Sequence, residues 1–305
     1  MEQVPAVVVV GSACRDLVDD DPRGWRLGGG AAYSALALAR LGLSVGAFVV
    51  ADDLADASHE LAEIRDAGVE VVRQPGSRGP VFVNVETPRG RVQRTPQVSD
   101  ACDPALLPPR WRHAAAWMLA PVAAEIPESW ASVPGPDAFV GLGWQGMLRV
   151  LSAGEAVGHL PPAASDVVRR ADLVGVGRDD FDPDATTIDD LASFMHPGAR
   201  LLVTDGARGG EAIDVADGSV PGRRRTWRSL QVTRFVDPVG AGDTFLAGVF
   251  AALVEPSLVR GWDGPDPELR LGAACASLVV EGSGLAAVPY RADAAARMHA
   301  GAAAD

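Results

Sequence analysis

DPVGAGDTFLAGVF, residues 237–250, carries the strongest structural signal in the chain. Apolar residues recur at helical spacing from Phe245 onward, so the stretch predicts a helix with Gly240–Gly242 in or just before its first turn. Free backbone amides and the positive end of the helix dipole make such a turn attractive to phosphate. Asp243 stands at the same place although a carboxylate would repel an anion, so its presence has to be explained.

Two explanations fit Asp243. Aspartate is favoured at helix N-termini, so this residue could be a structural cap. The small residues Gly240, Ala241 and Gly242 let a ligand approach the backbone closely, which favours a functional role instead. In that role the carboxylate takes the proton of an acceptor alcohol, while the backbone amides stabilise the charge of an arriving phosphoryl group.

The composition limits the classes of function. The 305 residues are 48% hydrophobic, which is enough for a large core. A net charge of −13 argues against nucleic acid or an anionic membrane as the main partner. All 27 basic residues are arginine, which excludes phosphate sites and Schiff bases that depend on lysine. Three cysteines far apart and five histidines without ligand spacing make zinc chemistry unexpected and fit a cytoplasmic protein.

Strand and helix patterns alternate along most of the chain. Apolar strands are predicted at 6–12, 44–50, 69–74, 114–121, 137–143, 171–177 and 199–206, with helices at 28–42 and 57–68 between the first three. This alternation is typical of the α/β class, with a three-layer α/β/α arrangement around a doubly wound, mostly parallel sheet. We expect a single domain over residues 1–305.

Three segments break this rhythm. Residues 78–98 alternate apolar and polar around a central turn, which predicts a hairpin that serves as a lid or is an edge hairpin without a role. Residues 17–27 are expected to be a short second lid element. The segments 210–220 and 223–228 are interpreted as a surface hairpin and a solvated basic loop.

A candidate dinucleotide fingerprint, GLGWQG at residues 141–146, matches G-x-G-x-x-G after a predicted strand. The next residues are interrupted by glycines and prolines, so no long helix is predicted to pack on the turn. A nicotinamide or flavin enzyme is therefore not favoured.

DPVGAGDTF resembles the C-terminal signature of the ribokinase-like (PfkB) carbohydrate kinases, D-[TP]-x-G-A-G-D-x-F. Other segments resemble that family in the same order: GS at 11–12 with Asp16, GGG at 28–30, LLVTDGARGG at 201–210 and GAACASLVVEGSG at 272–284. The resemblance covers residues 7–290. GGGAAYSALA, LAPVAAEIP and DPVGAGD are similar to the inositol-kinase-like branch.

The resemblance implies a role for each matching residue. Asp243 would be the general base, and Gly240, Ala241 and Gly242 would form the anion hole. The acceptor would be bound by Asp16, Gly29 and Gly30; the nucleotide by Thr204, Gly206 and Gly209; and a monovalent cation such as K⁺ by Asp237. ATP with Mg²⁺ would be the donor, and relatives that pair through their lids suggest a homodimer or, with a shortened lid, a monomer.

The sequence departs from the family pattern at two places. The N-x-x-E element that steers Mg²⁺ reads Gly177, Arg178, Asp179, Asp180, so Asp180 replaces a longer acid and the asparagine is absent. Tyr33 stands where a sugar-binding asparagine is usual, and with Gln145 it is expected to influence acceptor choice. The prediction is an ATP-dependent kinase for a hydroxyl of a small sugar, polyol or nucleoside-like molecule. The alternative is a non-catalytic or regulatory protein that binds the same ligands.

Overall fold

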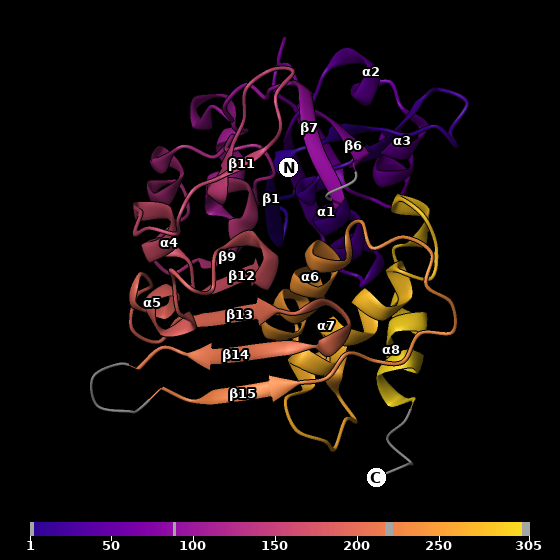
Figure 1. The fold of residues 1–305 in the computed structure, drawn as a ribbon. Coiled ribbons are helices and arrows are strands. Elements are labelled where there is room, and N and C mark those ends of the chain that lie inside the picture. The colour runs from indigo at the N-terminus through magenta and orange to yellow at the C-terminus, as the bar shows by residue number, and fades with distance from the viewer. Residues whose placement is uncertain (1–2, 88–89, 217–221, 301–305) are drawn as a thin grey trace.

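The computed structural model describes residues 3–87, 90–216 and 222–300 (Figure 1). Its centre is a nine-stranded sheet. The strand order is β15 (Arg224–Trp227), β14 (Gly210–Asp214), β13 (Arg200–Thr204), β12 (Leu173–Gly177), β9 (Phe139–Gly143), β8 (Ala116–Ala120), β1 (Val7–Ser12), β4 (Val45–Val50) and β5 (Glu70–Arg73). Neighbouring strands from β13 to β5 pair in parallel, whereas β14 and β15 pair antiparallel to their neighbours. The predicted α/β fold class is confirmed.

Helices pack on both faces of the main sheet, because both faces of its strands are apolar. In β1, for example, all four valines are fully buried: Val7 and Val9 belong to one hydrophobic cluster, and Val8 and Val10 belong to a second cluster. The α-helices are α1 (Gly30–Arg40), α2 (Asp53–Asp56), α3 (His59–Asp66), α4 (Asp166–Arg170), α5 (Ile188–Ser193), α6 (Ala241–Val254), α7 (Pro267–Val279) and α8 (Arg291–His299). The 3₁₀ turns are η1 (Pro104–Leu106), η2 (Pro109–His113), η3 (Glu128–Ser132), η4 (Trp144–Leu148), η5 (Arg178–Asp180), η6 (Gly206–Arg208), η7 (Pro256–Val259) and η8 (Leu285–Ala287).

A second, four-stranded sheet lies beside the main one. Its order is β3 (Trp25–Gly28), β2 (Cys14–Leu17), β6 (Val81–Thr87) and β7 (Gly90–Gln97). The strands β6 and β7 stand where a hairpin was predicted, and the predicted turn at 88–89 lies outside the described residues. A small ribbon of β10 (Arg149–Val150) and β11 (Gly158–His159) comes after η4.

Two predictions on the C-terminal edge of the sheet are wrong. The 210–220 segment was interpreted as a surface hairpin, but its first residues form β14, a strand of the main sheet; residues 217–220 lie outside the described part. The basic run 223–228 was interpreted as a solvated loop, yet it contains the edge strand β15 (Figure 1). The physical reason is Arg225, which is buried and pairs with acids from β14 and the start of α7.

Two further points concern other classes of protein. The GLGWQG segment forms β9 and the short 3₁₀ turn η4, without the long helix that a dinucleotide fingerprint requires. Within the described ranges, no helix combines the length and apolar character that a membrane crossing requires.

Candidate active site

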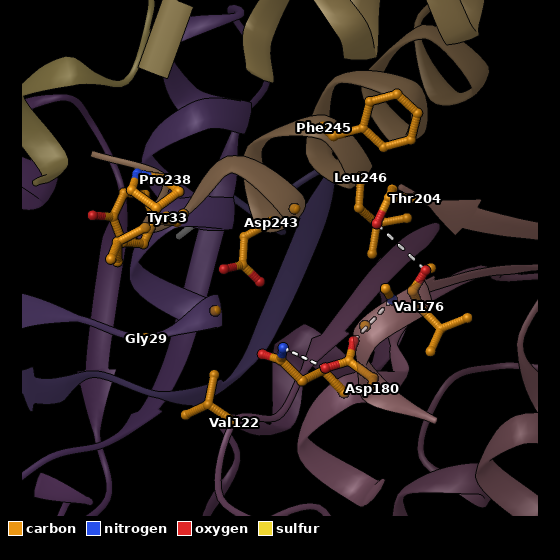
Figure 2. A pocket seen from close by; sticks show the side chains of 18 of the residues that line it. Gly29, Tyr33, Val122, Val176, Asp180, Thr204, Pro238, Asp243, Phe245 and Leu246 are labelled. Carbon is orange, nitrogen blue, oxygen red and sulfur yellow. Dashed lines mark hydrogen bonds between the residues drawn. The ribbon is translucent and has the colours of Figure 1, made fainter. Parts of the chain in front are cut away.

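A cavity of about 310 Å³ lies beyond the carboxyl ends of the parallel strands, where doubly wound sheets bind ligands (Figure 2). Residues that end β9, β12 and β13 form its floor, and the N-terminus of α6 forms one wall. Phe82 and Gln93 of the second sheet close it from another side. Among the residues predicted for the site, the cavity brings together Asp16, Gly29, Gly30, Tyr33, Gln145, Asp180, Thr204, Gly240, Gly242 and Asp243.

The start of α6 has the geometry of an anion site. Gly240 is the N-cap residue in a left-handed conformation (φ 79°), and no side chain caps the helix. A Cβ at this position would lie 2.3 Å from a ring carbon of Tyr33, so the close approach of that ring requires glycine here. The amide of Ala241 donates to the carbonyl of Pro238 at 3.2 Å. Asp243 lies in the first turn but makes no capping hydrogen bond, and Gly240 and Gly242 are the residues of the turn that line the cavity.

Asp243 projects from the first turn of α6 into the space between Gly29, Val122 and Asp180 (Figure 2). A Cβ on Gly30 would lie 3.0 Å from its Oδ1 atom, so the absence of a side chain at Gly30 makes room for the carboxylate. Burial raises the pKa of Asp243 to about 6, the nearby Arg149 guanidinium opposes that rise, and the Asp180 charge adds to it. A carboxylate in this state is poised to accept a proton near neutral pH.

Asp180 is held firmly although it replaces a longer acid. Its carboxylate is buried and accepts the backbone amide of Gly177 at 2.8 Å and the side-chain amide of Gln145 at 2.7 Å (Figure 2). Gln145, expected to contact the acceptor, thus lines the cavity with its amide nitrogen committed to Asp180.

Arg149 was missed by the sequence analysis. It lines the cavity, donates through Nη1 to the carbonyl of Val122 at 2.9 Å, and lies over the Phe82 ring at 5.7 Å from its centroid. Its Nε–H is buried and has no hydrogen-bond partner among the described residues. One arginine among 27 basic residues carries no local signal, because only the fold brings it to Asp243.

Asp16 lies on β2, at the side of the cavity formed by the second sheet. The thiol of Cys14 donates to its Oδ1 atom at 3.7 Å. Burial and the Asp16 charge raise the pKa of Cys14 well above its ordinary value, so the thiol stays protonated. Asp16 therefore presents a carboxylate acceptor to the cavity, beside the protonated thiol of Cys14, which also lines it.

A second cavity of about 400 Å³ adjoins the first. The two share Thr204, Pro238, Gly242 and Phe245 as lining residues. Gly206, Gly209 and Ala241, all predicted for the site, line this second cavity only. Trp227 stacks on Phe245 with ring centroids 4.9 Å apart, which makes a flat apolar wall. Most of its other lining residues are apolar, and sequence reasoning did not identify them: Ala207, Trp227, Leu230, Val232, Phe235, Ala273, Ala276 and Val280.

Asp237 lines neither cavity. Its Oδ1 atom accepts the backbone amide of Val239 at 3.0 Å, and its Oδ2 atom accepts the hydroxyl of Ser283 at 3.2 Å. The residue therefore contacts the segment just before α6 and does not line the ligand space.

Comparisons with known proteins agree with the resemblance found in the sequence. Residues 156–291 match the family model described as pfkB family carbohydrate kinase. No curated protein matches the chain. The resemblance to the PfkB family is thus confirmed over the C-terminal part of the chain.

Solved structures of kinases, some of them described as members of the ribokinase family, have the same fold. A pyrophosphate-dependent kinase complexed with a pyrophosphate analog and myo-inositol is 20% identical, with a TM-score of 0.70, over 95% of this chain and 99% of that one. The nucleoside kinase of Methanocaldococcus jannaschii is 18% identical, with a TM-score of 0.70, over 96% and 98%. Fructokinase with bound ATP from Xylella fastidiosa is 20% identical, with a TM-score of 0.69, over 97% and 98%. The chain has the ribokinase fold throughout.

Proposed function

We propose that the chain is a kinase that transfers the γ-phosphoryl group of ATP to a hydroxyl of a small sugar, polyol or nucleoside-like acceptor. One observation carries this proposal: the carboxylate of Asp243, which caps no helix, stands at a helix N-terminus where two cavities meet. Such a position serves a reaction in which a proton leaves one ligand while negative charge gathers on the other.

The residues divide the chemistry between them. The acceptor occupies the first cavity, where Asp16 accepts a hydrogen bond from one of its hydroxyls. Asp243 takes the proton of the reacting hydroxyl as its oxygen bonds to the γ-phosphorus. The bond from that phosphorus to the bridging oxygen of ADP breaks, and ADP keeps the electron pair. The amides of Gly240 and Gly242 stabilise the charge of the transferring group. The guanidinium of Arg149, which lines the first cavity, adds a positive charge beside the transferring group.

The second cavity favours ATP over pyrophosphate as the donor. Both kinds of donor occur in the similar structures, one with a pyrophosphate analog and another with ATP. Pyrophosphate has no apolar part, whereas a nucleobase suits a cavity with apolar walls and a flat Trp227–Phe245 stack.

Magnesium fits this arrangement through Asp180. The described residues contain no group of three or more His, Cys, Asp or Glu side chains that could hold a metal ion. Mg²⁺ commonly uses one or two carboxylates together with waters and substrate phosphates, so a single fixed acid suffices. Asp180, buried and oriented by Gly177 and Gln145, is that acid. Bound with the triphosphate, the ion neutralises part of its charge.

ADP release from magnesium–ATP against a panel of sugars, polyols and nucleosides tests the proposal, with pyrophosphate as a parallel donor and mass spectrometry of the product. We expect one acceptor class to give ADP and a phosphorylated product. A protein that binds both ATP and an acceptor but forms no product would support the regulatory alternative, which the missing asparagine at Gly177 motivates. Phosphorylation with pyrophosphate alone would contradict the assignment of the second cavity.

The pH dependence of kcat/KM should report Asp243. The base must be ionised, so the rate constant should rise as pH increases through about 6, the pKa that burial gives Asp243. Arg149→Met removes the charge that opposes this rise in pKa, so the acid limb of the profile should move to higher pH. Arg149→Lys keeps the charge and is the matched control. If the acid limb of the profile lay at the same pH for the wild type and Arg149→Met, Arg149 would not influence the pKa of the catalytic base.

Filling the second cavity should weaken ATP binding. Ala276 lines this cavity from α7, so Ala276→Phe places a ring in the space assigned to the base. We expect the KM for ATP to rise at least about tenfold, which corresponds to about 1.4 kcal/mol, with the KM for the acceptor little changed. Ala276→Ser is the size-matched control. An unchanged KM for ATP in Ala276→Phe would place the base elsewhere.

A further inference from the structure

Asp237, the residue expected to bind a monovalent cation, already has a cation beside it. Nη1 of Arg26, a side chain of β3, lies 3.8 Å from Asp237 Oδ2. The same Nη1 donates to the hydroxyl of Ser283, and that hydroxyl donates to Asp237 Oδ2 at 3.2 Å. At its other edge the guanidinium pairs with Asp20. Asp237 therefore has a cation from the chain itself beside it, which it shares with Asp20.

These residues do not fit a bound monovalent cation. An ion held by Asp237 and Ser283 would lie a few ångströms from a guanidinium that cannot lose its proton. Two like charges this close repel, and in a partly buried site water screens that repulsion less than at the surface. The repulsion between K⁺ and the Arg26 guanidinium therefore opposes binding of the ion at Asp237.

Asp237 matters because it stands three residues before the turn that starts α6. The amide of Val239 donates to its carboxylate, and the next residue is Gly240, the left-handed N-cap of α6. The amide of Val236 donates to the carbonyl of Val280 at 2.8 Å, which ties the same loop to the end of α7. Any group that holds Asp237 thus also positions the turn assigned to the phosphoryl group.

We propose that the Arg26 guanidinium takes the place of a monovalent cation in this protein, so that activity does not depend on K⁺. Arg26 acts as a positioning residue: it fixes Asp237 and Ser283 and, through them, the turn at Gly240. Arg26 belongs to β3 of the four-stranded sheet, and other strands of that sheet line the acceptor cavity.

Two measurements test this proposal in KCl, NaCl and choline chloride at about 0.1 M, where the Debye screening is the same. The first is kcat and KM with magnesium–ATP, which rests on the proposed kinase function. The second is the thermal unfolding midpoint without ligands, which needs no activity and so separates a failure of this inference from a failure of that function. The variants are Arg26→Met and, as a control, Arg78→Met, whose exposed side chain pairs with Asp100.

The wild type and Arg78→Met should each have the same kcat and the same midpoint in all three salts. Arg26→Met should lose about tenfold in kcat in choline chloride, because a displaced turn misplaces the reacting groups. KCl should restore part of that loss and raise the midpoint of Arg26→Met, since the vacated site can now bind the ion.

Three results would overturn the inference. The first is a wild type that KCl activates severalfold over choline chloride. The second is an Arg26→Met variant with normal kcat in choline chloride. The third is a loss in Arg26→Met that no monovalent cation restores, together with a midpoint that KCl does not change.

Discussion

Asp243→Asn is expected to lower turnover by at least about a hundredfold, the low end of the range for general-base catalysis. The substitution keeps the shape of the side chain and removes its ability to take a proton. No side-chain hydrogen bond caps α6, so the substitution removes no capping hydrogen bond from the helix. The effect should appear in kcat, with the KM for ATP nearly unchanged, because the groups of the second cavity remain in place.

The stability of the same variant provides an independent check. The pKa of Asp243 is raised to about 6 in the folded protein, above its ordinary value of 3.8, so folding favours the protonated form. The ionised carboxylate consequently destabilises the fold at pH values above about 6, and Asp243→Asn should unfold at a higher temperature there. Asp189→Asn, on the exposed face of α5, is the control for both measurements. Near-normal turnover in a stable Asp243→Asn protein would rule out Asp243 as the base.

Arg225→Met should lower the free energy of unfolding by about 3 kcal/mol, the low end for breaking a buried ion pair. Arg225 is 8% exposed, and its guanidinium contacts Asp214 at 2.8 Å, Asp266 at 2.9 Å and Glu268 at 3.0 Å. Removing it leaves these acids close together, with Arg200 still paired with Asp214 and Glu268, and the exposed Arg223 at 3.9 Å from Asp266. We expect the low end of the range for this loss in the free energy of unfolding, because Asp214 and Asp266 are partly exposed to solvent.

Urea unfolding at pH 7 measures this loss as a change in midpoint at constant slope. Arg223→Met is a matched control from the same run of arginines, because its side chain is 68% exposed and lies 3.9 Å from Asp266. It should change the free energy of unfolding by less than about 0.5 kcal/mol. Equal losses in the two variants would show that burial of Arg225 contributes nothing.

Much of the fold could be predicted because it depends on neighbours in the chain. The apolar run of β1 indicated a strand buried on both faces, and the helical spacing after Phe245 indicated α6. The strand β15 could not be predicted this way. RRRTWR has the composition of a solvated loop, and only the acids of β14 and α7 make it favourable to bury Arg225 in an edge strand.

The candidate site shows the same division. The sequence by itself determined the consecutive elements: the glycine turn, the helix after it, and Asp243 in the first turn. The geometry of these elements depends on residues that are adjacent in the chain, so it can be predicted from the sequence. It also determined that no lysine takes part.

Only the tertiary structure decided which residues surround that turn. Arg149 approaches Asp243, Trp227 stacks on Phe245, and Arg26 reaches Ser283 across 257 positions of the chain. These contacts form when the sheets and helices pack, and no periodicity or spacing in the sequence encodes them. The pKa of Asp243, the apolar second cavity and the cation beside Asp237 therefore belong to the fold, because burial and charge at a site are summed over residues distant in the sequence.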